Sequence, residues 1–131
     1  MEEVSHDELL KQLRGVQRIV INASYGGFSL SRDATLVYLD LAGVAYELLP
    51  QKDRDTQNRL GDRIVVNGID FESRTIPRDD PALVATVRRL GRKSWGEYAT
   101  LKVVEVPAGV QWTVDDYDGR EWVAEVHRTW R

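Results

Sequence analysis

Two dipeptides, Asn67-Gly68 and Asp118-Gly119, each lie between apolar, β-rich runs. A two-residue hairpin turn needs a left-handed backbone, which Asn or Asp followed by Gly adopts at low cost, and it joins strands that run antiparallel. The surrounding segments are "RIVVNGIDFESRTI" and "VQWTVDDYDGREWVAEVHRTWR". They predict two hairpins, so a large part of the strand content is expected to pair locally and antiparallel.

Three further segments carry the signals of a helix: a capping side chain in front, apolar residues at helical spacing, and a glycine behind. They run from Ser5 to Gly15, from Ser29 or Ser31 to Gly43, and from Asp80 to Gly91. The apolar runs "RIVINAS" and "ATLKVVEVP" predict two more strands.

Strands and helices therefore mix in an α+β fold, a mixed or antiparallel sheet with two or three helices packed on it. With 131 residues, of which 42% are hydrophobic, the chain is expected to form a single compact domain, 1–131. Within it we expect the N-terminal helix, 1–16, to be loosely attached. The polar segment 50–62, "PQKDRDTQNRLGD", has no periodic apolar residues and is predicted to be a mobile loop.

Composition excludes several classes of site and partner. Cysteine is absent, so there are no disulfides and no thiolate nucleophiles or ligands. A net charge of -3 argues against bulk, sequence-blind nucleic-acid binding. The N-terminal segment has no apolar signal core, and no run of residues is long and apolar enough for a membrane, so a cytoplasmic location is expected (host cytoplasm if phage-encoded). Arginine supplies 14 of the 18 basic residues, which favours anion recognition or reflects a G+C-rich genome.

The stretch "YGGFSLSR" contains the first candidate site. A strand that leads through two glycines into a helix start can bring backbone amides and the positive helix end to one point, where an anion is stabilised. The alternative is structural: glycines allow a sharp turn, serines cap the helix, and aromatics pack. The candidate ligand-binding residues are Tyr25, Gly26, Gly27, Phe28, Ser29, Ser31 and Arg32.

Two other candidate sites flank the third helix and the last strand. Arg74 and Arg78 can hold an anion in a forked grip, or belong to a solvated loop. Glu125 and His127 share one face of the last strand, where they can act as acid and base or simply pair. With two histidines and no cysteine, no metal site is expected, and no cofactor or catalytic residue is assigned.

The chain has four tryptophans, three of them in its last 20 residues. Alternation places Trp122 and Trp130 on the face of the last strand that we expect to pack on the core. Core or subunit-interface packing explains such residues most simply, and stacking on a nucleobase is the alternative. Trp130 would be poorly covered in a monomer, so a homodimer or higher homo-oligomer is expected.

Four blocks, "INASYGGFSLSRDA", "RDDPALVATVRRLG", "LKVVEVP" and "YDGREWVAEVHRTW", carry a resemblance. They are similar to a family of small, uncharacterised proteins from bacteriophages, large DNA viruses and bacteria with an IN-x-x-YGGF-x-LS start and a YDG-x-E…HRTW-like end. The blocks cover about two-thirds of the chain. The resemblance implies a viral or prophage setting, in which small single-domain proteins often act against host defences.

These observations lead to three functional hypotheses. The first is a non-enzymatic protein that sequesters a small anionic ligand, a nucleotide-derived signal, at the "YGGFSLSR" turn. The second is a protein–protein interaction module that inhibits a host or viral protein through the tryptophan-rich hairpin. The third is an enzyme acting on a nucleotide or sugar with Glu125 and His127.

Overall fold

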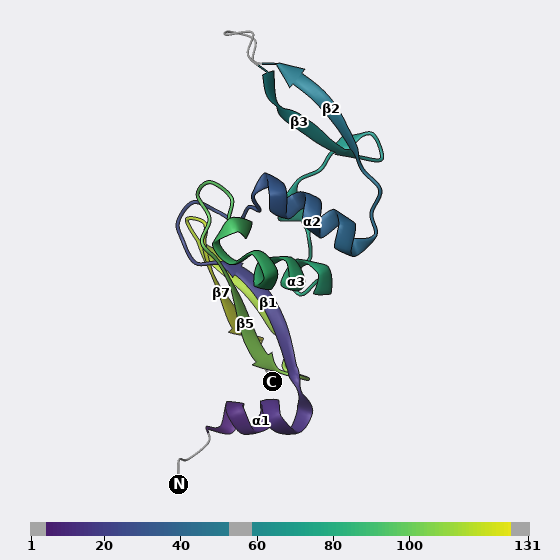
Figure 1. Ribbon diagram of the computed structural model, residues 1–131. Coiled ribbons are helices and arrows are strands. Elements are labelled where there is room, and N and C mark those ends of the chain that lie inside the picture. Colours follow the sequence, from purple (N-terminus) through teal and green to yellow (C-terminus); the bar gives the residue numbers. More distant parts are fainter. Residues whose placement is uncertain (1–4, 53–58, 127–131) are drawn as a thin grey trace, which may run out of the picture.

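The computed structural model describes residues 5–52 and 59–126. It confirms an α+β fold in which antiparallel sheets pack against helices (Figure 1). The helices are α1 (His6–Arg14), α2 (Arg32–Ala42) and α3 (Pro81–Leu90), with short 3₁₀ turns η1 (Ser73–Thr75) and η2 (Gly91–Ser94). The strands are β1 (Val16–Asn22), β2 (Glu47–Lys52), β3 (Arg59–Val66), β4 (Ile69–Asp70), β5 (Leu101–Pro107), β6 (Trp112–Tyr117) and β7 (Arg120–Glu125).

The described strands form three small antiparallel sheets, ordered β1-β5, β2-β3-β4 and β6-β7. Both predicted hairpin turns are confirmed. Asn67 and Gly68 have φ of 51° and 78°, and Asp118 and Gly119 have φ of 52° and 87°, the left-handed backbone that a two-residue turn requires.

The core lies between the β1–β5 ribbon and the helices α2 and α3. Ile19, Val20 and Ile21 are all buried, although successive strand residues point to opposite faces. Val20 belongs to the cluster formed with Leu39 and Leu83 of the helices, whereas Ile21 lines a pocket with residues of the β6–β7 hairpin. The ribbon is therefore covered by helices on one face and by the hairpin on the other.

Side-chain caps begin the three helices as the sequence predicts. The Ser5 hydroxyl accepts from Glu8 N at 3.1 Å, and of the two candidate serines it is Ser31 that caps α2. Asp80 caps α3 through one carboxylate oxygen, and its other oxygen accepts from the Tyr38 hydroxyl of α2 at 2.9 Å. One carboxylate thus begins α3 and fixes it against α2.

The predicted loop over 50–62 is wrong at both ends, because β2 and β3 extend into it. Gln51 pairs with Leu60 and Lys52 with Arg59, and the centre of the segment lies outside the described residues. Polar strands escape a search for apolar periodicity, since their order comes from backbone pairing with the neighbouring strand. The β2–β3 hairpin extends from α2 away from the β1–β5 ribbon (Figure 1).

The predicted core face of the last strand is also wrong. Trp122 is 45% exposed, whereas the side chain of Glu121, on the opposite face of the strand, is only 9% exposed. Alternation separates the two faces of a strand but does not decide which is covered. Here an ion pair made by Glu121 decides it.

Candidate functional site

The end of β1 is built around Asn22, a buried amide that sequence reasoning missed. Its Oδ1 accepts from Thr100 N at 2.8 Å and from Ser24 Oγ at 3.0 Å, and its Nδ2 donates to the carbonyls of Ser24 and Gly119, both at 2.8 Å. All its bonding groups are therefore used. A polar residue that directly follows three apolar ones in a strand was the available signal, because a buried amide requires partners.

The two glycines that follow are explained by packing and turn geometry. A Cβ on Gly26 would lie 2.1 Å from the carbonyl oxygen of Tyr98, so only glycine allows this approach. Gly27 has φ of 89°, and a Cβ added to it would meet nothing within 4 Å. The Cβ position of Gly26 is therefore filled by Tyr98, which explains this glycine by packing, whereas an anion cradle at this corner stays a prediction.

Arg78 lies at the same junction at the end of β1, and it does not line a site together with Arg74. Its guanidinium donates to both carboxylate oxygens of Glu121, at 2.5 and 2.9 Å, and lies 3.7 Å from the centre of the Phe28 ring. Glu121 also accepts from Asn22 N at 2.8 Å. The forked grip predicted for the two arginines is wrong, because each arginine has a different partner. Arg78 forms a buried ion pair with Glu121, and Arg74, in η1, pairs with Glu72.

The candidate serines are likewise engaged within the protein. Ser31 Oγ donates to the Lys93 carbonyl at 2.6 Å and accepts from Ala34 N at 3.1 Å. The Ser29 carbonyl accepts from Gly96 N at 2.9 Å, and its side chain packs so closely that a Cβ on Gly96 would lie 1.9 Å from Ser29 Oγ. Both serines therefore connect the start of α2 to the segment that follows α3.

A pocket of about 420 Å³ nevertheless opens beside the N-terminus of α2 and collects four of the predicted residues. Phe28, Ser29 and Arg32 reach it from the loop and the first turn of α2, and Arg74 reaches it from η1. Phe71 adds a second aromatic ring to its lining, and Glu72 adds an acidic side chain. The structure thus separates the predicted site into a packed glycine corner and an open arginine-lined pocket.

Within this pocket, each of the two arginines contacts a protein group that a bound anion can displace. Arg32 donates to the backbone carbonyl of Asp62, a neutral acceptor. Arg74 contacts Glu72 at 2.9 Å, but the side chains of this pair are 73% and 54% exposed. Exposed ion pairs contribute only about 0–1 kcal/mol, so a phosphate held by two arginines can replace them.

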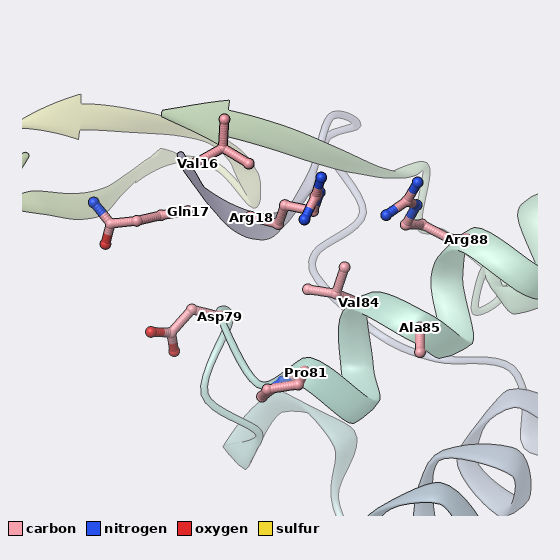
Figure 2. Close-up of a pocket in the computed structure, with 8 residues that line it drawn as sticks. All are labelled: Val16, Gln17, Arg18, Asp79, Pro81, Val84, Ala85 and Arg88. Atoms are coloured by element: carbon pink, nitrogen blue, oxygen red, sulfur yellow. The ribbon is translucent and has the colours of Figure 1, made fainter. Parts of the chain in front are cut away.

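A second arginine-lined pocket, of about 460 Å³, lies between β1 and α3. Figure 2 shows Arg18 and Arg88 at one end, Asp79 at the other, and Val84 between them. Arg18 pairs with Glu105 at 3.3 Å, and Glu105 lines the adjoining hollow with both arginines. The negative charges of Asp79 and Glu105 therefore offset the positive charges of the two arginines. This pocket is a poorer anion site than the pocket beside α2.

The remaining predicted residues lie elsewhere. Tyr25 lines a third pocket at the β6–β7 hairpin. Glu125 is exposed at the end of β7, and His127 and Trp130 fall outside the described residues, so neither the acid–base pair nor the dimer contact is described. In residues 5–52 and 59–126 no group of three His, Asp or Glu side chains is placed to hold a metal ion.

One titratable group in the helix layer is strongly perturbed. Burial, together with the hydrogen bond to the Asp80 carboxylate and its charge, raises the pKa of Tyr38 to about 12. This group joins α2 to α3 and lines no pocket described above, so its shift reports on stability and not on chemistry.

Comparison of the chain with protein-family models, curated proteins and solved structures finds no match. None of the helices in the described part of the chain has the length and apolar character needed to cross a membrane.

Proposed function

We propose that this protein is a non-enzymatic binding protein for a small anionic ligand of the nucleotide type, held in the pocket beside the N-terminus of α2. One observation carries the proposal: Arg32 and Arg74, more than 40 positions apart in the chain, line the same pocket of about 420 Å³. Two guanidinium groups from independent segments form a clamp that matches phosphate oxygens.

The position of Arg32 adds an electrostatic reason. It is the first residue of α2, where the helix dipole is positive and a cation is unfavourable. A bound anion would relieve both the dipole and the arginine charge. Asp33 in the same turn is exposed and does not line the pocket. It therefore offsets part of the positive charge at the start of the helix without occupying the position of an anion between the two arginines.

Aromatic rings supply a surface for the uncharged part of the ligand. Phe28 and Phe71 both line the pocket, and each ring is contacted by another side chain. The Arg78 guanidinium lies 3.7 Å from the centre of the Phe28 ring, and the centre of the Tyr38 ring lies 6.1 Å from that of Phe71. Rings that are fixed before binding lose little entropy on stacking. A nucleotide satisfies both requirements, phosphate for the arginines and a base for the rings.

Sequestration needs no bond to be broken. Binding alone lowers the concentration of a free signal when the protein outnumbers it, which suits the viral counter-defence setting implied by the sequence resemblance. The ligand is therefore expected to leave the protein chemically unchanged.

The test is calorimetric titration with a panel of linear and cyclic nucleotides, using Arg32→Gln, Arg74→Gln and the control Arg89→Gln. Arg89 is exposed in the last turn of α3 and lines none of the pockets described here. A charged hydrogen bond contributes about 1.5–3 kcal/mol, so each pocket variant should bind roughly 10- to 100-fold more weakly. The control should bind as the unmodified protein does.

Three results would overturn the proposal. The first is that no nucleotide binds. The second is that a nucleotide binds equally well to both pocket variants. The third is a reaction product in the recovered ligand, which would favour the enzyme hypothesis. Absence of binding together with a co-purifying protein would favour the interaction module.

A further inference from the structure

A third pocket, of about 440 Å³, lies where the β1–β5 ribbon meets the β6–β7 hairpin, and its lining is aromatic. Tyr25, Tyr117 and Trp122 all line it, and they are 60%, 71% and 45% exposed. Large aromatic side chains bury much apolar area when they are covered. Three that remain exposed around one hollow therefore mark a surface that a ligand can complete.

The rings are presented by rigid backbone. Tyr117 directly precedes the Asp118-Gly119 turn, whose Gly119 carbonyl accepts from the Asn22 side chain. Trp122 sits opposite Asp115 in the β6–β7 pairing. Tyr25 is followed by Gly26, which is packed against Tyr98. The junction thus fixes the backbone that carries these side chains, which lowers the entropy cost of binding.

Two cations border the rings. Lys102 pairs with Ile21 in the β1–β5 register, on the ribbon face that meets the hairpin. The Arg120 guanidinium lies 5.9 Å from the centre of the Tyr25 ring. Within residues 5–52 and 59–126 no carboxylate lies at ion-pair distance from either cation.

Glu121 is the single acidic residue in the lining of this pocket, and its carboxylate is occupied by Arg78. The pocket therefore combines exposed aromatic faces with two positive charges that no acid in the described structure neutralises. This differs from the α2 pocket, where Glu72 pairs with Arg74, and from the pocket of Figure 2, where acids balance the arginines.

We infer that this hairpin pocket binds a nucleotide, either free or within a single strand. The base stacks on Trp122 and a tyrosine, and the phosphate is held by Lys102 and Arg120. Base–aromatic stacking beside a basic groove is how single-stranded nucleic acid is bound, and the same groups suit a free nucleotide. The shared chemistry is the base with its phosphate. The inference does not depend on the site proposed beside α2.

The experiment compares four probes by titration calorimetry: adenosine 5′-monophosphate, adenosine, ribose 5-phosphate and a single-stranded oligonucleotide of about ten thymidines. The first and last carry both base and phosphate, whereas the other two carry one each. We expect the complete ligands to bind more tightly than either fragment. An oligonucleotide that binds more tightly than the mononucleotide, with affinity falling as salt rises, identifies a single strand as the source.

Four variants assign the binding to the pocket. Trp122→Ala should weaken binding roughly 10- to 100-fold, the range reported by removing one stacking ring, and Trp122→Phe should restore part of the loss. Lys102→Gln should weaken binding and reduce its salt dependence. Arg89→Gln, the exposed control variant on α3, should leave it unchanged. Because Trp122 and Lys102 are exposed, the circular dichroism and melting temperature of these variants are expected to match those of the unmodified protein.

The pattern of losses separates the two proposals. Binding that falls with Trp122→Ala but not with Arg74→Gln supports the hairpin pocket, and the reverse pattern supports only the α2 pocket. If Trp122→Ala binds every probe as the unmodified protein does, or if none of the four probes binds, the inference is wrong. In that case a co-purifying protein lost with Trp122→Ala would identify the aromatic cluster as a protein-docking surface.

Discussion

Replacing Glu121 by Gln is expected to destabilise the whole fold, because Glu121 joins three segments that are distant in the sequence. Its carboxylate accepts from both guanidinium nitrogens of Arg78 and from the backbone N–H of Asn22. The substitution keeps the size of the side chain and removes its charge. Arg78 then remains among protein groups without an ionic partner.

The magnitude follows from burial. The side chains of Arg78 and Glu121 are 17% and 9% exposed, so water can replace little of the lost interaction. Removing one partner of a buried ion pair costs about 3–5 kcal/mol, a large part of the total stability of a single domain. For a chain of this length we expect the melting temperature to fall by roughly 10–20 °C.

The assay is equilibrium denaturation by urea at pH 7, on Glu121→Gln, Arg78→Met and the double variant. A matched control is Glu105→Gln, which removes the acid of the half-exposed Arg18 pair and should cost less than about 1 kcal/mol. If the two groups stabilise each other, the double variant loses less than the sum of the single losses. The difference measures the coupling between Arg78 and Glu121.

A loss below about 1 kcal/mol for Glu121→Gln, comparable to the control, would refute this reasoning. So would strict additivity of the two substitutions, because it would mean that the groups do not interact. Either result would also remove the explanation given above for the exposure of Trp122, since that explanation requires the Glu121 face of β7 to be anchored.

Two further predictions concern the glycine corner and the helix layer. Gly26→Ala should lose about 2 kcal/mol or more in urea denaturation, because its Cβ meets the Tyr98 backbone at 2.1 Å; Gly27→Ala, strained only by φ of 89°, should lose about 1–2 kcal/mol, and the opposite order would contradict the packing described. Tyr38 keeps its proton to a higher pH when folded, so its contribution is present below pH 10 and is lost as the pH rises toward its folded pKa of about 12. Stability should therefore fall over that range by on the order of 2–3 kcal/mol, and Tyr38→Phe, whose bond to Asp80 is lost, should flatten this slope in alkaline unfolding curves.

Much of the local structure could be predicted because few residues determine it. The caps Ser5, Ser31 and Asp80 each act on amides two or three residues away. The Asn67-Gly68 and Asp118-Gly119 turns set their own backbone angles. These signals are sufficient for three helices, two hairpins and an α+β class.

The candidate site was predicted only in part, because its residues are brought together from distant segments. Phe28, Ser29 and Arg32 were expected near one anion and do line one pocket. Arg74 joins them, but Arg78, four residues later, faces Glu121. No local pattern distinguishes Arg74, whose partner Glu72 is two residues away, from Arg78, whose partner lies 43 residues away.

The sequence by itself determined where the chain turns, where helices begin, and which strand residues share a face. Tertiary structure decided which face is covered, that Gly26 is filled by Tyr98 and that Trp122 remains exposed. The physical reason is range: a cap or a turn is complete within a few residues. The burial of Asn22 and Glu121 depends on groups 43 to 99 positions away, which meet only after the fold has formed.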